Sequence, residues 1–448
     1  MKYQVIVIGG GPAGYTAAES AGKAGLSVLL IEKDKLGGVC LNEGCIPTKT
    51  LLYSAKIYEQ TLHALKYAVN VKDVSFDLPK MILRKTRIIR RLVLGVKAKL
   101  LSTNHVTIVT GEAQIFDNHT VSCGNETYEC DYLILCTGSK TFIPPLPGLD
   151  TVNYWTHREA LESKELPESL VIVGGGVIGM EFASFFNSLG TQVTVIEMLD
   201  EILGGMDKEM AELLRTDYTK KGVVFLTSTK VTALEKIDEN TIITYENAQG
   251  TGNIAASKLL MSVGRRPVTK GFGLENLNLE TGERGRIIIN KKMQTSVSNV
   301  YVCGDMTGFS LLAHTAIREA EVAINSILNI DDAMSYRAIP NVVYTNPEIA
   351  GVGQTEENLK DNNLPYKTIK LPLTFSGRFV AENDGINGMC KLLLDNNDKI
   401  LGAHLYGNPA SEIITLAGIA IEQQITSSTW RKTIFPHPTV SEIFREIL

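Results

Sequence analysis

Two cysteines, Cys40 and Cys45, stand five positions apart in the segment 37–49. On an ideal α-helix this spacing would separate their Cα atoms by roughly 8–9 Å, whereas a disulfide requires about 4.4–6.8 Å. If the two cysteines pair, the segment must be distorted between them, and Gly44 is the residue that permits the distortion. A zinc site is disfavoured because no second Cys/His pair follows at the usual spacing. The pair is therefore a candidate redox dithiol, with two buried packing cysteines as the alternative.

A histidine near the end of the chain, His437, is a candidate base. Pro436 and Pro438 flank it and stiffen its backbone, and Glu442 follows five residues later. A carboxylate that holds one ring nitrogen fixes the tautomer of the imidazole, which can then take a proton from a thiol near neutral pH. For these residues alone, a structural histidine is the better interpretation.

The cysteines follow a strand–turn–helix–strand unit that occurs twice in the chain. Residues 3–32 contain a strand, the turn 9–14, an Ala-rich helix and a second strand, and residues 170–197 repeat this order in register. In a G-x-G-x-x-G turn the first glycine permits the tight turn, the second admits a pyrophosphate, and the third lets helix and strand pack closely. The acid that ends each unit accepts hydrogen bonds from a ribose and repels a 2′-phosphate. We therefore predict two bound dinucleotides, one on Gly9, Gly11, Gly14 and Glu32 and the other, 165 residues further on, on Gly174, Gly176, Gly179 and Glu197.

The remaining pattern predicts an α/β protein with three domains. Residues 50–101 are expected to be helical with a break near 71–79, residues 106–131 to be rich in strands, and residues 132–135 and 300–303 to form further strands. A proline-rich linker occupies 143–148, and from about residue 338 strands and helices alternate without a nucleotide motif. The predicted architecture is two Rossmann-like dinucleotide-binding domains followed by a C-terminal α+β domain.

The composition excludes several classes of protein. A net charge of −5 without a long basic run argues against nucleic-acid binding, and the basic cluster Arg84, Lys85, Arg87, Arg90 and Arg91 is interpreted as the solvated face of a helix. No apolar run reaches the roughly 18–20 residues of a membrane span. Seven cysteines, most of them scattered, favour a reducing, cytoplasmic setting over secretion.

The two dinucleotide units, the Cys-x4-Cys pair and the C-terminal His-Pro-x-x-x-Glu together resemble the pyridine nucleotide–disulfide oxidoreductases, from residue 5 to residue 442. Segments 37–49, 312–314, 402–404 and 437–439 are most similar to the members that reoxidise protein-bound dihydrolipoyl groups with NAD⁺. The resemblance implies an FAD-binding domain at 1–141 and 271–337, an NAD-binding domain at 142–270 and an interface domain at 338–448. It also implies a homodimer whose active site is shared between subunits. The expected partner is the lipoyl-carrying domain of a 2-oxoacid dehydrogenase or glycine cleavage complex.

The resemblance also implies roles for individual residues. Cys45 would face the flavin, Cys40 would exchange with the substrate dithiol, and no metal would be required. The catalytic residues would be Cys40, Cys45, Lys49 paired with Glu181, and His437 held by Glu442. The FAD site would comprise Gly9, Gly11, Pro12, Ala13, Gly14, Glu32, Lys33, Gly38, Val39, Lys49, Gly111, Ala113, Thr137, Gly138, Ser139, Asp305, Ala313 and His314. The NAD site would comprise Gly174, Gly176, Val177, Ile178, Gly179, Glu197, Val231, Gly264 and Arg265.

Two other functions remain open: another FAD-dependent disulfide reductase, similar to glutathione reductase, and a non-catalytic NADH-sensing flavoprotein. The acidic run 197–200 argues against NADPH, whose 2′-phosphate requires Arg or Lys, and no arginine lies near Cys45 in the sequence to receive a glutathione carboxylate. The chain departs from the family pattern at Val39, where Thr is usual, at Glu43, where an apolar residue is expected, and at Phe435-Pro436, where His-Ala is more frequent. Glu43 adds negative charge beside the dithiol. None of these departures removes a catalytic group.

Overall fold

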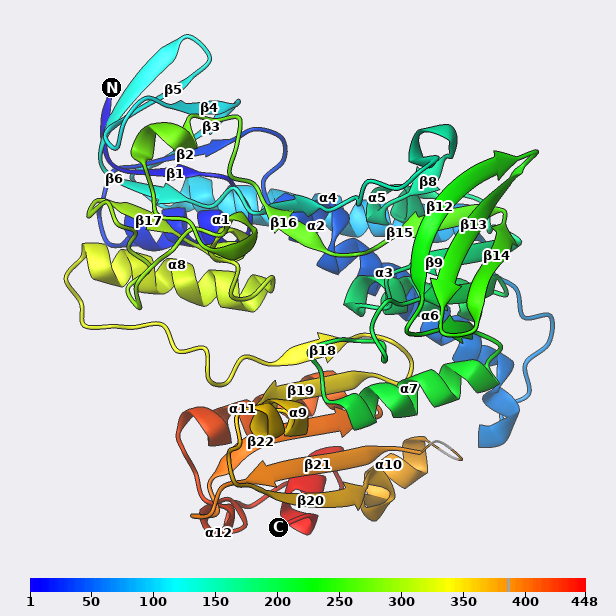
Figure 1. Ribbon diagram of the computed structural model, residues 1–448. Helices are drawn as coiled ribbons and strands as arrows, with labels where there is room; N and C mark the ends of the chain where they lie inside the picture. The colour runs from blue at the N-terminus through cyan, green and yellow to red at the C-terminus, as the bar shows by residue number, and fades with distance from the viewer. Residues whose placement is uncertain (384, 386) are drawn as a thin grey trace. The chain divides into compact units, whose positions relative to one another are not determined.

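The computed structural model describes residues 1–383, 385 and 387–448, which form two compact units. Unit 1 comprises Met1–Thr50, Leu83–Phe142 and Gly264–Ser335, and unit 2 comprises Leu51–Ile82, Ile143–Val263 and Tyr336–Leu448. Helices α3 (Cys45–Leu62) and α4 (Leu78–Ser102) contribute residues to both units (Figure 1). Unit 2 thus combines the predicted NAD-binding segment with the C-terminal segment, and the three domain boundaries stay a prediction.

Unit 1 is built on a seven-stranded sheet in the order β3-β2-β1-β6-β5-β4, with β17 paired to β6. Strands β1, β2, β3, β6 and β17 pair in parallel. Helices cover such sheets, which explains the apolar runs at 5–8, 28–31, 132–135 and 300–302. Helices α1 and α8 pack against each other (Figure 1). The elements are β1 (Lys2–Ile8), α1 (Pro12–Lys23), β2 (Val28–Glu32), α2 (Gly38–Glu43), β3 (Val106–Thr110), β4 (Ala113–Ile115), β5 (Thr120–Cys123), β6 (Glu126–Leu135), β7 (Ser139–Thr141), β16 (Arg265–Pro267), β17 (Val300–Val302) and α8 (Ala313–Ile327).

The first part of unit 2 repeats this design. Five parallel strands lie in the order β11-β10-β9-β15-β8, and an antiparallel ribbon β12-β13-β14 accompanies them. The elements are β8 (Tyr154–Trp155), α5 (His157–Glu162), β9 (Ser169–Val173), α6 (Val177–Ser188), β10 (Gln192–Ile196), α7 (Lys208–Lys220), β11 (Val224–Leu226), β12 (Lys230–Ile237), β13 (Asn240–Asn247), β14 (Gly250–Ala256) and β15 (Lys258–Met261).

The second part of unit 2 is an antiparallel sheet in the order β18-β19-β22-β21-β20, against which α11 packs. One core joins both parts, because Phe182 of α6 and Leu214 of α7 pack in the same cluster as Ile349 and Tyr406 of the C-terminal sheet. The elements are β18 (Asn341–Val343), β19 (Ile349–Gly353), α9 (Glu356–Asp361), β20 (Lys367–Pro372), α10 (Gly377–Glu382), β21 (Met389–Leu394), β22 (Ile400–Tyr406), α11 (Ala410–Glu422), α12 (Ser427–Trp430) and α13 (Ile443–Glu446).

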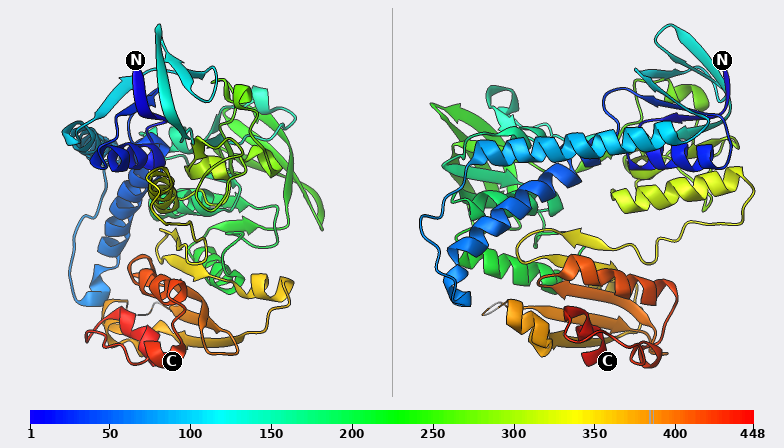
Figure 2. Two further views of the ribbon diagram at one scale, coloured as in Figure 1. Left: turned by 90° about the vertical axis from the view of Figure 1, so that its left-hand side faces the viewer. Right: turned by 180° about the vertical axis from the view of Figure 1, so that it is seen from behind.

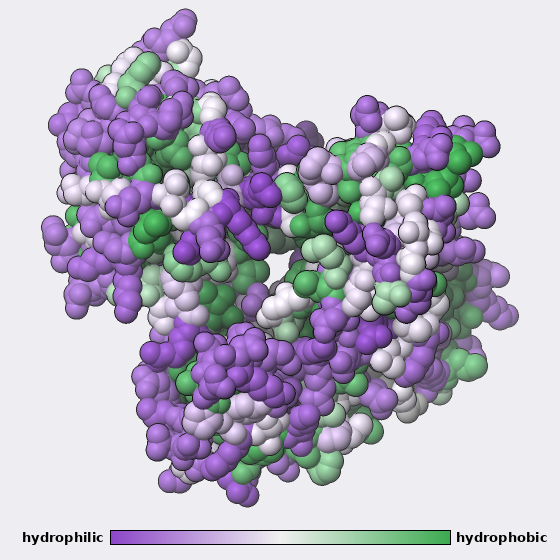
Figure 3. Space-filling view, in the orientation of Figure 1, coloured by the Kyte–Doolittle hydropathy of each residue, from purple (hydrophilic) through white to green (hydrophobic). Residues whose placement is uncertain are grey.

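One surface expectation is wrong. The basic cluster lies on α4, which is seen along its full length in Figure 2, but Lys85 is completely buried, because it shares a helix face with Leu78 and Ile82. Arg87, Arg90 and Arg91 are exposed, as expected. Hydrophilic side chains cover most of the face in Figure 3. Among the described residues, no helix is both long and apolar enough to span a membrane.

Candidate functional site

In the turn between β1 and α1, neighbouring backbone atoms leave no room for a side chain at Gly9 and Gly14, whereas Gly11 borders open space. A methyl group on Gly9, which has φ +102°, would lie 2.3 Å from the Cys136 carbonyl oxygen, and one on Gly14 would lie 1.7 Å from the Gly9 oxygen. A methyl group on Gly11 would meet nothing nearer than the Gly38 Cα at 3.9 Å. The first and third glycines are therefore required by packing, and the second leaves the space that a pyrophosphate needs.

The turn between β9 and α6 repeats this geometry. A methyl group on Gly174 or on Gly179 would lie 2.6 Å or 2.0 Å from a backbone oxygen, whereas one on Gly176 would meet no atom within 4 Å. In both turns no side chain caps the helix that follows, so its first N–H groups are available to an anion. Both sites therefore fit a dinucleotide phosphate.

The acid at the end of each unit is held against its own glycine turn. Glu32 accepts hydrogen bonds from the backbone N–H groups of Gly10 at 2.5 Å and Asp34 at 2.8 Å. Glu197 accepts the two equivalent bonds, at 2.7 and 2.8 Å, from the residues 165 positions further along the chain. Each carboxylate is thereby fixed beside a predicted phosphate site, where a ribose hydroxyl would lie.

The carboxyl ends of the unit 1 strands gather further predicted flavin residues. Ser139 donates a hydrogen bond to Asp305, whose carboxyl pKa is raised by burial, an effect partly offset by this bond and by the charge of Arg265. Thr137 donates to the Val268 carbonyl at 2.8 Å. Arg265, predicted with the NAD residues, donates to the Ser139 hydroxyl at 2.8 Å and therefore lies among the flavin residues.

The dithiol segment breaks where the spacing required it to break. Helix α2 ends at Glu43, α3 begins at Cys45, and Gly44 between them has φ −133° and ψ −112°. A methyl group on Gly44 would lie 2.8 Å from the Val39 carbonyl oxygen, so only glycine fits this junction. Both cysteines are half-buried thiols in this structure. The break brings the two side chains into hydrogen-bonding contact.

The electrostatics of the dithiol keep one thiol protonated. The pKa of Cys40 is raised by its hydrogen bond to Cys45, by burial and by the charge of Cys45, while the charge of Lys49 acts in the opposite direction. Thiol–disulfide exchange proceeds through a thiolate, and of the two reduced cysteines Cys40 is held in its protonated form.

The predicted base has a defined tautomer. His437 Nδ1 lies 2.9 Å from Glu442 Oε1, and the His437 side chain is 80% exposed. The second Glu442 oxygen accepts from the Thr439 backbone N–H at 2.8 Å; this bond and the one from His437 hold the pKa of the carboxyl below its usual value. Because a carboxylate only accepts, Nδ1 carries the proton and Nε2 of the neutral ring is left as the base.

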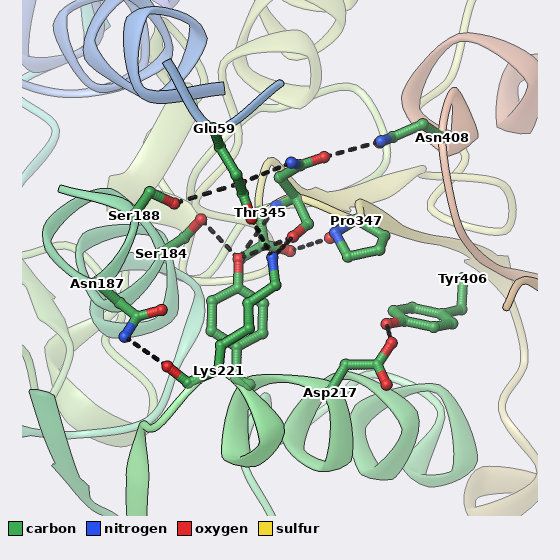
Figure 4. Close-up of polar contacts among 12 residues, drawn as sticks. Glu59, Ser184, Asn187, Ser188, Asp217, Lys221, Thr345, Pro347, Tyr406 and Asn408 are labelled. Atoms are coloured by element: carbon green, nitrogen blue, oxygen red, sulfur yellow. Dashed lines mark hydrogen bonds and ion pairs between the residues drawn. The ribbon is translucent and has the colours of Figure 1, made fainter. Parts of the chain in front are cut away.

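Helix α6, which carries Glu181, is anchored inside unit 2. Glu181 is 3% exposed and accepts a hydrogen bond from the Tyr344 backbone N–H at 3.1 Å. On the same helix, Ser184 accepts from Tyr218 at 2.7 Å within the polar network of Figure 4, where Lys221 also donates to Glu59 at 2.7 Å. These contacts fix the position of α6 before any ligand binds.

The predicted site residues divide between the two units. Every residue predicted for FAD lies in unit 1, as do Cys40, Cys45 and Lys49, whereas Glu181, His437 and Glu442 lie in unit 2. Of the NAD residues, Gly264 and Arg265 belong to unit 1 and the others, including Val231, to unit 2. The pairing of Lys49 with Glu181 stays a prediction. Among the described residues, no group of three or more His, Cys, Asp or Glu side chains is placed to hold a metal ion.

Two residues near the dithiol, Asn42 and Tyr15, were not predicted from the sequence as part of the site. Asn42 donates from Nδ2 to the backbone oxygens of Leu36 at 3.0 Å and Gly38 at 2.9 Å, which fastens α2 to the preceding loop. Burial raises the pKa of Tyr15, and the nearby charges of Cys40 and Cys45 raise it further. Its place directly after Gly14 was the only signal in the sequence.

Comparison with known proteins agrees with this geometry. Residues 3–325 match the pyridine nucleotide-disulphide oxidoreductase family, and residues 339–448 match the dimerisation domain of the same family. The chain therefore belongs to this family and is an FAD-dependent disulfide oxidoreductase with a dimerisation domain that supports a homodimer. Members of the family use FAD and NAD(P).

The chain is also similar over its full length to curated relatives and to solved structures. The chain is 37% identical over 455 residues to the dihydrolipoyl dehydrogenase of Mycoplasma pneumoniae, covering 100% of the chain and 98% of that protein. It is 38% identical over 452 residues to that of Geobacillus stearothermophilus, covering 100% and 95%. Its fold is similar to LpdA of Mycobacterium tuberculosis, with a TM-score of 0.91, 25% identity and coverage of 99% and 98%. It is also similar to the HOCl-induced flavoprotein disulfide reductase RclA of Escherichia coli in its Cu(II) complex, with a TM-score of 0.89, 28% identity and coverage of 100% and 99%.

Proposed function

We propose that the protein is a dihydrolipoyl dehydrogenase, which oxidises protein-bound dihydrolipoamide to lipoamide and reduces NAD⁺ to NADH. The observation that carries this proposal is the α2–Gly44–α3 junction, which brings the Cys40 and Cys45 thiols into contact. Full-length relatives at 37% and 38% identity that bear this name support the choice of substrate.

In the oxidised enzyme, Cys40 and Cys45 form a disulfide. A substrate thiolate attacks Cys40, and the Cys45 sulfur leaves as a thiolate. The second substrate thiolate then attacks the mixed disulfide at its substrate sulfur, which forms the lipoyl disulfide and releases Cys40. The substrate has lost two electrons and two protons, and the cysteine pair has gained two electrons.

His437 and Glu442 provide the proton acceptor for this exchange. Nδ1 stays bonded to Glu442 at 2.9 Å, so Nε2 is free to take a proton from the substrate thiol. Because the His437 side chain is 80% exposed on the dimerisation domain, we propose that it completes the site of the partner subunit.

FAD, when bound, would supply the redox chemistry that links the reduced cysteines to NAD⁺. We assign the FAD phosphates to the turn 9–14, the FAD ribose to Glu32 and the flavin polyol to Asp305. The NAD phosphates are assigned to the turn 174–179 and the NAD ribose to Glu197. The carboxylate of Glu197 supports NAD⁺ over NADP⁺, because it would face the additional phosphate at close range.

The predicted domains, location and partner belong to the same proposal. The FAD domain would comprise 1–141 and 271–337, the NAD domain 142–270 and the interface domain 338–448, in a cytoplasmic enzyme. Its partner would be the lipoyl-carrying domain of a 2-oxoacid dehydrogenase or glycine cleavage complex.

Steady-state turnover of the purified holoenzyme tests this function. Dihydrolipoamide with NAD⁺ should give rapid formation of NADH, while dihydrolipoamide with NADP⁺ and glutathione disulfide with NADH or NADPH should give little. Turnover with glutathione disulfide alone would identify a different disulfide reductase. Inactivity in every assay would favour the sensing flavoprotein and overturn the proposal.

A further inference from the structure

Arg265 is held in unit 1 by its backbone as well as by its side chain. It begins β16, whose residues 265–267 pair antiparallel with β7, and Arg265 lies opposite Thr141. The Nε group donates to the Ser139 hydroxyl at 2.8 Å and Nη2 donates to the Ser139 carbonyl at 2.6 Å. A two-point contact by the rigid guanidinium fixes the direction from which Ser139 is approached.

This contact decides where the Ser139 hydroxyl hydrogen points. Because the Ser139 oxygen accepts from Arg265, its own hydrogen is directed to Asp305 Oδ2, with which it bonds. Ser139 is 7% exposed, so water does not compete freely for the bond. Arg265, Ser139 and Asp305 thus form a directed chain of hydrogen bonds.

This series of hydrogen bonds leaves one carboxylate oxygen of Asp305 available as an acceptor. Oδ2 is engaged by Ser139, while Oδ1 makes no hydrogen bond with any residue that the structure describes. The positive charge of Arg265 opposes the rise in the Asp305 pKa that burial causes, and so favours the carboxylate, which can only accept. An accepting oxygen fixed at this edge suits a hydroxyl group of the ligand.

We propose that Arg265 is a positioning residue for the flavin cofactor rather than a ligand of NAD. It acts through Ser139 and holds Asp305 with Oδ1 presented to a hydroxyl of the flavin polyol. The proposal rests on the assignment of Asp305 to that polyol in the proposed function. It replaces the sequence-based expectation that Arg265 contacts NAD.

The neighbouring arginine provides a matched control. Arg266 is exposed, and its guanidinium carbon lies 3.8 Å from the centre of the Phe142 ring. It makes no contact with Ser139 or Asp305 among the contacts described. Replacing either arginine by methionine removes one positive charge from the same strand, so an effect confined to position 265 cannot come from net charge or from β16 alone.

The test is the rate at which the holoenzyme releases FAD, followed by the rise in flavin fluorescence after dilution. R265M should release FAD at least about tenfold faster than the wild type, R265K should lie between the two, and R266M should match the wild type. S139A removes the hydroxyl that links Arg265 to Asp305 without changing Arg265, so it should also accelerate the release of FAD. The R265M/S139A double variant should then release FAD little faster than the more affected single variant, because both act on one chain. With FAD in excess, the KM for NAD⁺ of R265M should stay within twofold of the wild type.

Several results would overturn the proposal. Release of FAD from R265M at the wild-type rate would show that Arg265 does not act on the flavin site. A raised KM for NAD⁺ with unchanged FAD release would return Arg265 to the NAD site. Fully additive effects of R265M and S139A would remove Ser139 as the intermediary. Circular dichroism of each variant identifies misfolding, in which case R265K and S139A carry the test. Wild-type turnover of dihydrolipoamide is measured separately, so failure of the proposed function is distinguishable from failure of this inference.

Discussion

His437 and Glu442 lie five residues apart, and the 2.9 Å bond between them decides which ring nitrogen can act as a base. Cys40 and Cys45 are also five residues apart, and their side chains meet because Gly44 interrupts the helix between them. In both cases a spacing of five residues becomes a contact between two side chains. At the scale of single residues, the proposed chemistry depends on these two contacts.

Replacing either His437 or Glu442 should slow the transfer of a proton from the substrate thiol. We expect H437Q to lower kcat/KM for dihydrolipoamide by about 10²–10⁴-fold, the usual contribution of a general base. E442Q should lower it by about 10- to 100-fold, because a hydrogen bond to a charged group is worth about 1.5–3 kcal/mol. Oxidation of NADH by ferricyanide, which bypasses the dithiol, should be unchanged in both variants. Unchanged kcat/KM in H437Q would exclude this histidine as the base.

The junction of α2 and α3 shows how an element positions the chemistry. Gly37 and Gly38 begin α2 with φ of +97° and +56°. Asn42 donates to the Gly38 oxygen within the helix and to the Leu36 oxygen in the loop before it. Thr48 donates to the Gly44 oxygen at 2.6 Å and so fixes the start of α3. The dithiol is thus held by short backbone links on both sides of the break.

A methyl group at position 44 should disturb this junction. We expect G44A to lower dihydrolipoamide-driven NAD⁺ reduction by about 10- to 100-fold, because a misplacement of about 1 Å is costly for a reacting group. G95A is the matched control, since Gly95 is an exposed position in α4 where a methyl group meets no atom within 4 Å. It should keep full activity and gain about 0.4–1 kcal/mol in the free energy of unfolding. Wild-type turnover of G44A would contradict the role of the junction.

Elements with strong local signals could be predicted from the sequence. The two glycine turns, the break at Gly44 and the interrupted helical region were predictable because glycine, proline and hydrophobic periodicity act locally. The burial of Lys85 and the position of Arg265 were not, because they depend on tertiary packing and on the pairing of β16 with β7. The contacts of Asn42 depend on loop geometry that composition does not encode.

At the scale of the whole molecule, a buried ionic cluster joins the two parts of unit 2. Lys391 of β21 is completely buried and contacts Asp207 at 2.8 Å, Glu209 at 3.2 Å and Glu356 at 2.5 Å. Asp207 also caps α7 by accepting from the Met210 N–H. The cluster therefore ties the helix that follows Glu197 to the dimerisation domain.

Removing the buried cation should be costly at neutral pH. We expect K391M to lower the free energy of unfolding by about 3–5 kcal/mol, because it leaves buried carboxylates unpaired. K370M is the control, since Lys370 is 41% exposed and its pair with Glu209 at 2.7 Å should contribute about 1 kcal/mol or less. Urea unfolding of both variants at pH 7 measures the difference. Equal loss in the two would contradict the importance of the buried pair.

The same cluster predicts a dependence on pH. Burial alone would raise the pKa of Glu356, but hydrogen bonds from Lys391 and Thr368 outweigh it and lower the pKa to about 2. A lowered pKa contributes stability above the ordinary value of 4.5, which is lost as the pH falls from there towards 2. The difference in the free energy of unfolding between wild type and K391M should therefore decrease as the pH falls from 4.5 towards 2. A difference that stays constant from pH 7 to pH 2.5 would contradict the assignment.

The shared active site can be tested by mixing two inactive subunits. A heterodimer of C45S and H437Q contains one site with intact cysteines and an intact histidine from the partner. If the site is shared, this heterodimer should show about half the activity of the wild-type dimer. Two differently tagged subunits, co-expressed and purified through both tags, provide the sample. Background activity would place His437 and the cysteines of one site in the same subunit.

The main mechanistic proposal is that Cys40 and Cys45 carry the electron pair between the substrate and the flavin. Its most direct test is to alkylate the denatured protein before and after one equivalent of dihydrolipoamide, without NAD⁺ and under anaerobic conditions. Mass spectrometry then reports each cysteine separately. We expect Cys40 and Cys45 to be protected in the oxidised enzyme and both to become alkylated after substrate, while the other five cysteines are alkylated throughout. A pair that is alkylated before substrate, or that remains protected after it, would exclude these two cysteines as the carriers of the electron pair.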